Sequence, residues 1–231
     1  AMVLSELDPA KYQWRIAQCG QFLIDNQCDN GQWNYGEETK IPRDTPTFSK
    51  PKTEDVASGG GKKGERSRPK KQILLGRYRG GAPSGDNSNT QYGVLGLRAC
   101  IEAGVIPPRE TLELTKKWFE AALNNDGGWS YGGKGGDSYG SMTAGAVGTL
   151  AILYTYLRID WRASRHIVKG VKWLGENLAV KENPKTANGC VWHYYWLYAL
   201  ERAGELLAVD KFGSHEWYRQ GALFLLEKQN A

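Results

Sequence analysis

Polar and aromatic residues that could take part in chemistry gather in three short segments of this sequence. In each segment a hydroxyl, amide, imidazole or carboxylate lies within a few positions of an aromatic ring. Aromatic rings with a few polar groups are the usual lining of a ligand pocket, and their faces attract cations. The candidate cavity residues are Asp86, Asn89, Gln91 and Tyr92 in the first segment, Asp137, Tyr139 and Ser141 in the second, and Trp192, His193 and Tyr195 in the third. The sequence does not single out a catalytic residue among them.

Each of these residues also has a purely structural interpretation. Asp86 and Asp137 are typical of helix N-caps. Tyr195 could simply fill the core, and His193 could be a hydrogen-bonded core histidine. What favours a ligand site is the coincidence that three segments in succession carry such residues. We expect the other two histidines, His166 and His215, to lie exposed on helices of the outer layer.

No metal site and no cofactor is expected. The four cysteines, Cys19, Cys28, Cys100 and Cys190, form no C-x-x-C pair. They are therefore either free thiols or, in an exported protein, two disulfides. His193 has no thiolate or carboxylate at zinc-ligand spacing. The stretch 58–64 (SGGGKKG) lacks the G-x-x-x-x-G-K-[ST] pattern of a phosphate-binding loop.

The positive charge of the chain is local. The formal net charge is +5, and residues 36–84 contain twelve Lys or Arg against six Asp or Glu. We interpret residues 37–84 as a basic, Gly-rich insertion loop that could meet an acidic partner, and we expect no nucleic acid partner. The longest apolar run, residues 144–157, is shorter than the roughly 18 residues that a membrane span needs, so no span is expected.

Internal repeats are the strongest signal. Four helix-like segments align on an aromatic residue at Phe22, Trp118, Trp173 and Phe224, with gaps of 96, 55 and 51 residues. The first gap equals one repeat plus the insertion. After Phe22, the residues Gln27, Gly31 and Trp33 read Q-x-x-x-G-x-W, and the same offsets after Trp118 give Leu123, Gly127 and Trp129.

Two kinds of helix alternate along the chain. Residues 12–24 and 111–123 have apolar positions three and four apart, which predicts helices with one buried face. Residues 90–103, 141–157 and 192–203 are apolar or small nearly all round, which predicts helices buried on all sides. The sequence therefore predicts a single all-α domain over residues 1–231, an α/α toroid of two-helix repeats. About seven helices would form a partial ring.

The repeat motif resembles the QW motif of the squalene cyclase and prenyltransferase-like family. The resemblance rests on Gln27, Gly31 and Trp33, and on Gly127–Gly128–Trp129, which is similar to a turn of the protein prenyltransferase β subunits. It implies an α/α toroid with a central cavity, in which the Gln caps helix ends and the Trp ties neighbouring repeats. The D-x-D-D acid motif of the cyclases and the zinc ligands of the prenyltransferases are not found in this sequence.

The resemblance therefore implies a non-catalytic module that binds an apolar or polymeric ligand or acts as a scaffold. Two alternatives stay open: a terpene cyclase whose acid motif lies in repeats missing here, and a toroid polysaccharide lyase. The repeat pattern stops at Gln229, where Gly and Trp should follow, so we expect a truncated ring. A partial ring would need either a homodimer or the remainder of a larger chain to cover its apolar flanks.

Overall fold

The computed structural model describes residues 1–39, 69, 71–189 and 191–229, and these residues are mostly helical. Within them the chain forms eight α-helices and one short parallel sheet, so the prediction of an all-α chain is confirmed. The helices are α1 (Met2–Leu7), α2 (Gln13–Asp25), α3 (Asn87–Glu102), α4 (Arg109–Ala121), α5 (Gly140–Leu157), α6 (Arg165–Asn177), α7 (His193–Leu207) and α8 (Trp217–Gln229). The sheet pairs β1 (Ile73–Leu74) with β2 (Val105–Ile106), and a 3-10 turn covers Trp161–Ala163.

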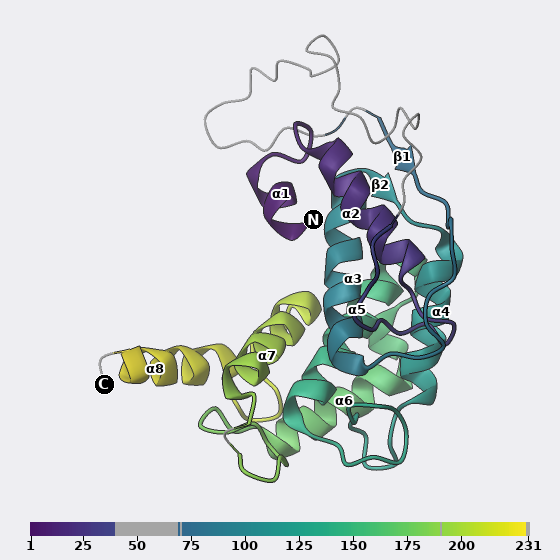
Figure 1. Ribbon diagram of the computed structural model, residues 1–231. Helices are drawn as coiled ribbons and strands as arrows, with labels where there is room; N and C mark the ends of the chain where they lie inside the picture. Colours follow the sequence, from purple (N-terminus) through teal and green to yellow (C-terminus); the bar gives the residue numbers. More distant parts are fainter. Residues whose placement is uncertain (40–68, 70, 190, 230–231) are drawn as a thin grey trace.

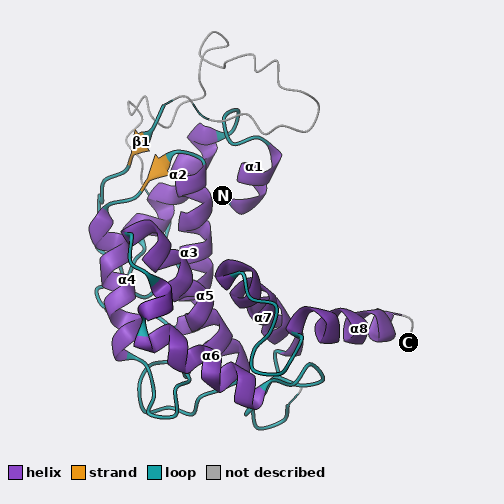
Figure 2. Ribbon diagram, turned by 180° about the vertical axis from the view of Figure 1, so that it is seen from behind, coloured by secondary structure: helices purple, strands orange, loops and turns teal. Residues whose placement is uncertain are grey.

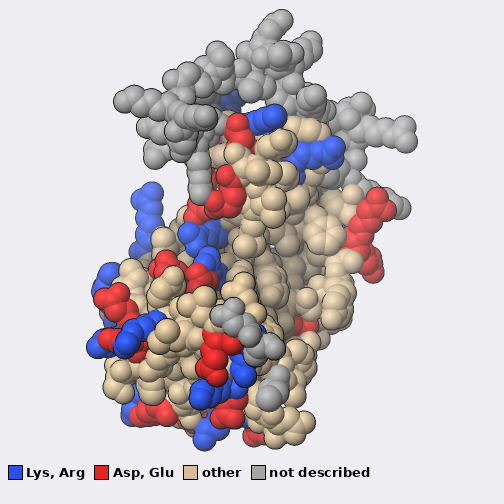
Figure 3. Space-filling view, turned by 90° about the vertical axis from the view of Figure 1, so that its left-hand side faces the viewer, with Lys and Arg blue, Asp and Glu red and all other residues tan. Residues whose placement is uncertain are grey.

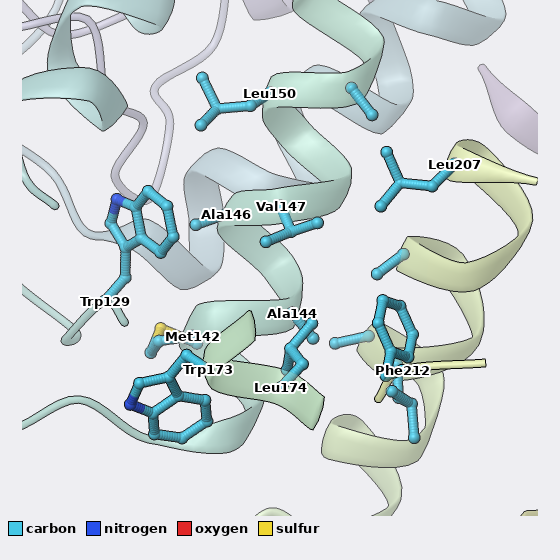
Figure 4. Packing of buried hydrophobic residues seen from close by; sticks show 14 of the residues in the cluster. Trp129, Met142, Ala144, Ala146, Val147, Leu150, Trp173, Leu174, Leu207 and Phe212 are labelled. Carbon is cyan, nitrogen blue, oxygen red and sulfur yellow. The ribbon is translucent and has the colours of Figure 1, made fainter. Parts of the chain in front are cut away.

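Helix α5 is the centre of the molecule. It packs against α3, α4, α6 and α7, and nearly all of its residues are buried. The sequence explains this, because α5 carries Gly, Ala and Leu on all sides and has no charged residue. Figure 4 shows Val147 and Leu150 of α5 between Trp129 on one side and Leu207 and Phe212 on the other.

Helices α2, α4 and α6 bury only one stripe each. In α6 the buried positions are Ile167, Gly170, Trp173 and Leu174, which recur at helical spacing. These helices lie on the outer side of the curve that the chain follows in Figures 1 and 2, with α1 at one end and α7 and α8 at the other. No helix in the described ranges has the length and apolar character to cross a membrane.

Helices α3 and α7 differ from the expectation of burial on all sides. Tyr92 on α3 is exposed, and so are Tyr194 on α7 and Trp192 at its N-cap. The physical reason is that α5 has helices on both flanks, whereas one side of α3 and of α7 faces the inside of the curve (Figure 1). These two helices therefore keep aromatic side chains exposed.

The repeat predicted from Trp33 and Trp129 is visible in their hydrogen bonds. Trp33 Nε1 donates to Leu23 O at 2.8 Å, and Trp129 Nε1 donates to Phe119 O at 2.9 Å. Each indole thus satisfies a carbonyl near the end of the preceding outer helix, where helix carbonyls lack partners. The backbone N–H of Trp33 donates to Thr90 Oγ1 (2.9 Å), and that of Trp129 donates to Thr143 Oγ1 (3.0 Å). The turn therefore fixes the start of the following inner helix.

The same turns lock neighbouring repeats together. Gly31 and Gly127 adopt φ values of +90° and +91°, which favour glycine. A Cβ at Gly31 would lie 2.6 Å from Leu114 O on the next outer helix, and one at Gly127 would lie 3.1 Å from Lys169 O. Each turn thus packs directly on the backbone of the outer helix that follows.

The end of the predicted insertion packs on the first repeat. Strand β1 pairs with β2, so this part of residues 37–84 is not a simple loop. Arg77 donates to Gln27 O, and Arg79 donates to Asn26 Oδ1 and to Glu37 O. Residues 40–68 and 70, which include the stretch 58–64 and many of the basic residues, lie outside the described part of the chain.

Candidate functional site

The candidate site lies where α3, α5 and α7 begin. We call the five rings Tyr92, Tyr139, Trp192, Tyr195 and Tyr198 the aromatic face. Tyr92 comes from α3, Tyr139 is the N-cap of α5, and Trp192 is the N-cap of α7, which also carries Tyr195 and Tyr198. Figure 3 looks into the concave side and shows a hollow lined by uncharged residues, with Lys, Arg, Asp and Glu around it.

Backbone contacts between repeats place these helix starts side by side. The N–H of Asn87 at the start of α3 donates to Tyr131 O, and that of Gly140 at the start of α5 donates to Pro184 O, both at 2.9 Å. The loop that precedes each inner helix therefore holds the first turn of the inner helix before it. The same contact occurs twice, so the starts of α3 and α5 are held in the same way.

The rings stack in two groups. Tyr92 lies at 5.9 Å from Tyr195 and at 6.1 Å from Tyr198, measured between ring centroids, with interplanar angles of 29° and 12°. Tyr139 and Trp192 stack at 6.5 Å and 26°. Offset stacking at these distances is favourable. Tyr92 and Trp192 are exposed, at 46% and 61%, so ring surface remains for a ligand.

A few polar groups lie beside the aromatic face. The hydroxyl of Tyr195 donates to Gln91 Oε1 at 2.9 Å, which joins α7 to α3. Burial raises the pKa of Tyr195, and the charge of Asp86 raises it further, although a hydrogen bond with Ser88 acts in the opposite direction. Burial likewise raises the pKa of Tyr139 to about 12, helped by Tyr131 and Asp86. Both phenols therefore stay protonated at neutral pH, and that of Tyr195 acts as a hydrogen-bond donor.

Asp86 and Asn89 stabilise the first turn of α3. Asp86 is the N-cap of α3: its Oδ1 accepts from the backbone N–H of Asn89 at 2.7 Å, and its Oδ2 accepts from the Asn89 side-chain amide at 2.7 Å. This is the capping geometry that satisfies the free N–H groups of a first turn. The charge of Asp86 also acts on Tyr139 and Tyr195 and raises the pKa of both phenols.

Three predicted residues do not join the aromatic face. Asp137 is exposed in the loop before α5, whose N-cap is Tyr139. Ser141 is fully buried, and its backbone N–H and hydroxyl bind the side chain of Asn183 at 2.9 and 3.1 Å. His193 makes contacts elsewhere: its Nε2 is 2.7 Å from Val180 O, and its ring packs on Phe224 at 5.0 Å.

Sequence reasoning missed an apolar groove next to Tyr92. The groove has a volume of about 610 Å³ and is lined by α1, α2 and α3. Its walls include Met2, Val3, Phe22, Leu23 and Gly96. The signal that could have found it is Phe22, the aromatic position of the first repeat, which is 38% exposed. The groove extends the aromatic face with an apolar surface.

The described residues offer little to hold a metal ion. No group of three or more His, Cys, Asp or Glu side chains comes together among them. Cys19, Cys28 and Cys100 are free thiols, and Cys190 lies outside the described residues.

Protein-family models and curated proteins were searched, and none of them matches the chain.

Proposed function

We propose that this chain is a binding module of the α/α-toroid type, similar to the repeats of squalene cyclases and prenyltransferases, and that its aromatic face holds an elongated ligand. The alternation of α2, α4 and α6 with α3, α5 and α7, and the repeated Trp33 and Trp129 contacts, support the toroid assignment. A curved double layer of this kind has a concave side on which a long ligand can lie.

One observation carries the binding proposal: exposed stacked rings continue into an apolar groove. Tyr92 belongs both to the ring stack and to the wall of the groove. A chain-like apolar ligand would cover both surfaces, and a polymer such as an oligosaccharide would use mainly the ring faces. Monomeric proteins rarely leave such surfaces uncovered without a partner or ligand.

Two probes distinguish the ligand classes. Farnesol represents an apolar chain and cellohexaose represents a neutral polysaccharide. We expect one of them to bind the wild-type chain in isothermal titration calorimetry with a dissociation constant below about 1 mM, a weak but specific affinity. Trp192→Ala or Tyr92→Ala should weaken that binding about tenfold, because each removes one ring from a contact worth roughly 1 kcal/mol or more.

Tyr218→Ala is the matched control. Tyr218 is 66% exposed on α8 and makes no ring contact with the aromatic face. Its removal takes away the same ring but should leave binding unchanged. The proposal is wrong if neither probe binds, or if Tyr218→Ala weakens binding as much as Trp192→Ala does.

The two enzymatic alternatives have less support. The cyclase alternative places its acid motif in repeats missing here, and among the described residues Asp86, the carboxylate beside the aromatic face, is the N-cap of α3. A lyase needs a base and a neutralising group at one substrate carbon. Among the described residues, His193 contacts Val180, Tyr194 and Phe224, and no hydrogen bond joins it to Asn89.

A further inference from the structure

A polar pocket away from the aromatic face lies between the end of α4 and the start of α6. It has a volume of about 340 Å³. The charged and titratable side chains that line it are Glu120, Lys134, Arg165, His166 and Lys169. A volume of this size is at the small end of ligand pockets, which suits a small molecule or a single functional group.

The positive charges of the pocket exceed its negative charge. Glu120 is already paired, because its Oε2 lies 2.9 Å from Lys116 Nζ and its Oε1 accepts from the Tyr154 hydroxyl at 2.7 Å. Within the described residues, Lys134, Arg165 and Lys169 form no ion pair with a carboxylate. Three cations therefore share one small pocket without an anion of their own.

His166 lies among these cations as a neutral ring. Its Nε2 is 3.4 Å from Arg165 Nε, which can only donate, so Nε2 is the acceptor and Nδ1 carries the proton. Nδ1 lies 4.0 Å from Glu120 Oε1. Burial lowers the pKa of His166, and the charges of Arg165, Lys116 and Lys169 lower it further against the opposing effect of Glu120. The prediction that His166 is exposed is wrong: only 14% of its side chain is accessible.

The walls of the pocket are fixed relative to one another. Asn124 holds the loop that carries Lys134, since its side chain donates to Gly136 O at 2.8 Å and accepts from the Gly135 N–H at 2.9 Å. Gly127 packs on the backbone of Lys169, which ties the same turn to α6. These contacts therefore fix the loop that carries Lys134 relative to the part of α6 that carries Lys169.

We propose that this pocket binds a small oxyanion group, a phosphate or sulfate borne by a small polar molecule. Arg165 can form two parallel hydrogen bonds to such a group, and Lys134 and Lys169 can neutralise its second charge. A protonated His166 would add a further donor once the anion offsets the neighbouring cations. A carboxylate, with one charge, would leave more of the pocket's positive charge uncompensated.

Titration of the wild-type chain with inorganic phosphate and with inorganic sulfate, against chloride at equal ionic strength, tests the proposal. We expect both oxyanions to give saturable binding in isothermal titration calorimetry and chloride to give none. Lys169→Ala and Lys134→Ala should each weaken binding roughly three- to tenfold, because each removes one charge at close range. Circular dichroism checks that both variants are folded.

Lys172→Ala is the matched control for Lys169→Ala. Lys172 lies on the same helix, pairs with Glu176 at 3.6 Å and does not line the pocket. The Lys172→Ala variant should bind sulfate as tightly as the wild type does. Equal losses in Lys172→Ala and Lys169→Ala would show a non-specific charge effect and would overturn the proposal, as would oxyanion binding no tighter than that of chloride.

The pH dependence provides an independent readout. Sulfate keeps its two charges throughout the neutral range, so any change in its affinity comes from the protein. The groups that face His166 are Glu120 and Lys116 of α4, Arg165 and Lys169 of α6, and Tyr154 of α5 through Glu120. Between pH 8 and 5.5, His166 is the group of this pocket whose charge we expect to change. Sulfate affinity should rise across that range, and the rise should disappear in His166→Gln; an equal rise in the variant would contradict the proposal.

Discussion

At the scale of single residues, the turn glycines and the Glu120 cluster decide how well neighbouring repeats hold together. Gly31 combines a left-handed backbone with a close approach to Leu114 O, so any side chain there meets two penalties. Glu120 joins α4 to Tyr154 of α5 and to Lys116 in a partly buried site. The contributions of both features to stability can be tested without any ligand.

Gly31→Ala should lower the free energy of unfolding by about 2 kcal/mol or more. The added methyl group would lie 2.6 Å from Leu114 O, and alanine at φ +90° is strained. Gly221→Ala on α8 is the control, because nothing lies within 4 Å of its Cβ position. It should be neutral or stabilise by up to about 1 kcal/mol, since alanine favours helix. Urea unfolding measures both; equal effects would contradict the packing described for Gly31.

Stability should fall in two steps as the pH falls. Burial and the neighbouring cations hold the pKa of His166 below its ordinary value of 6.5, so protons bind the unfolded chain more tightly and stability declines below about that pH. Burial opposes ionisation of Glu120, but the hydrogen bonds from Lys116 and Tyr154 outweigh it and lower its pKa below 4.5. Its stabilising contribution is complete above that value and is lost as the pH falls through the lowered pKa.

Melting temperatures measured from pH 8 to pH 3 show both steps. His166→Gln should flatten the upper step and leave the lower one. If wild type and variant decline in parallel between pH 7 and 5.5, His166 is not the group responsible.

At the scale of elements, α5 couples the core to the aromatic face. Gly145 of α5 lies against the Gln91 side chain, whose Oε1 accepts the hydrogen bond from Tyr195. Gly148, one turn further along, faces α7 with ordinary van der Waals space, 3.4 Å from Leu206. The same substitution at these two positions should therefore have different results.

Gly145→Ala should displace Gln91, break its bond to Tyr195 and weaken ligand binding at the aromatic face about threefold or more, because a hydrogen bond of this kind contributes roughly 1 kcal/mol. Gly148→Ala should leave binding unchanged. The Tyr195 hydroxyl signal in nuclear magnetic resonance, together with titration of whichever probe binds the wild type, reports both effects. Equal binding in the two variants would show that Gln91 does not position the ring.

The helices themselves could be predicted from sequence, because apolar spacing and small-residue content are local. The Trp33 and Trp129 turns could be predicted too, since the same residues recur at the same offset. Helix α1 and the pairing of β1 with β2 could not, because six- and two-residue elements carry too little periodicity. The direction of His193 depends on Phe224, which lies far along the chain, so its own neighbours in sequence gave no sign of it.

At the scale of the whole molecule, the helices differ in how completely other helices pack around them. Helix α5 has neighbours on every side, whereas α8 packs mainly on α7 and buries only Trp217 and Phe224. Regions with few buried contacts open with less free energy than the core does. The fold should therefore loosen from its α8 end before α5 opens.

Hydrogen exchange followed by mass spectrometry should show this gradient. We expect amides of α5 to exchange the slowest and those of α8 to exchange at least about tenfold faster, which corresponds to a difference of 1.4 kcal/mol or more in opening free energy. Comparison at low and high protein concentration is the control. Strong protection of α8 at high concentration alone would mean that a second copy covers it, and equal protection of α8 and α5 when dilute would contradict the gradient.

The isolated bridge between Trp33 and Asp86 has a consequence for how this protein could change length. The N–H of Asp86 donates to Trp33 O at 3.0 Å, so the stretch of chain that follows Trp33 is closed again at Asp86. Doubling the length of a closed loop costs only about 0.6 kcal/mol of loop-closure free energy. The stretch between Trp33 and Asp86 is thus a place where the chain can lengthen or shorten at little cost in free energy. The same place would accept an inserted reporter domain while the helical layers stay intact.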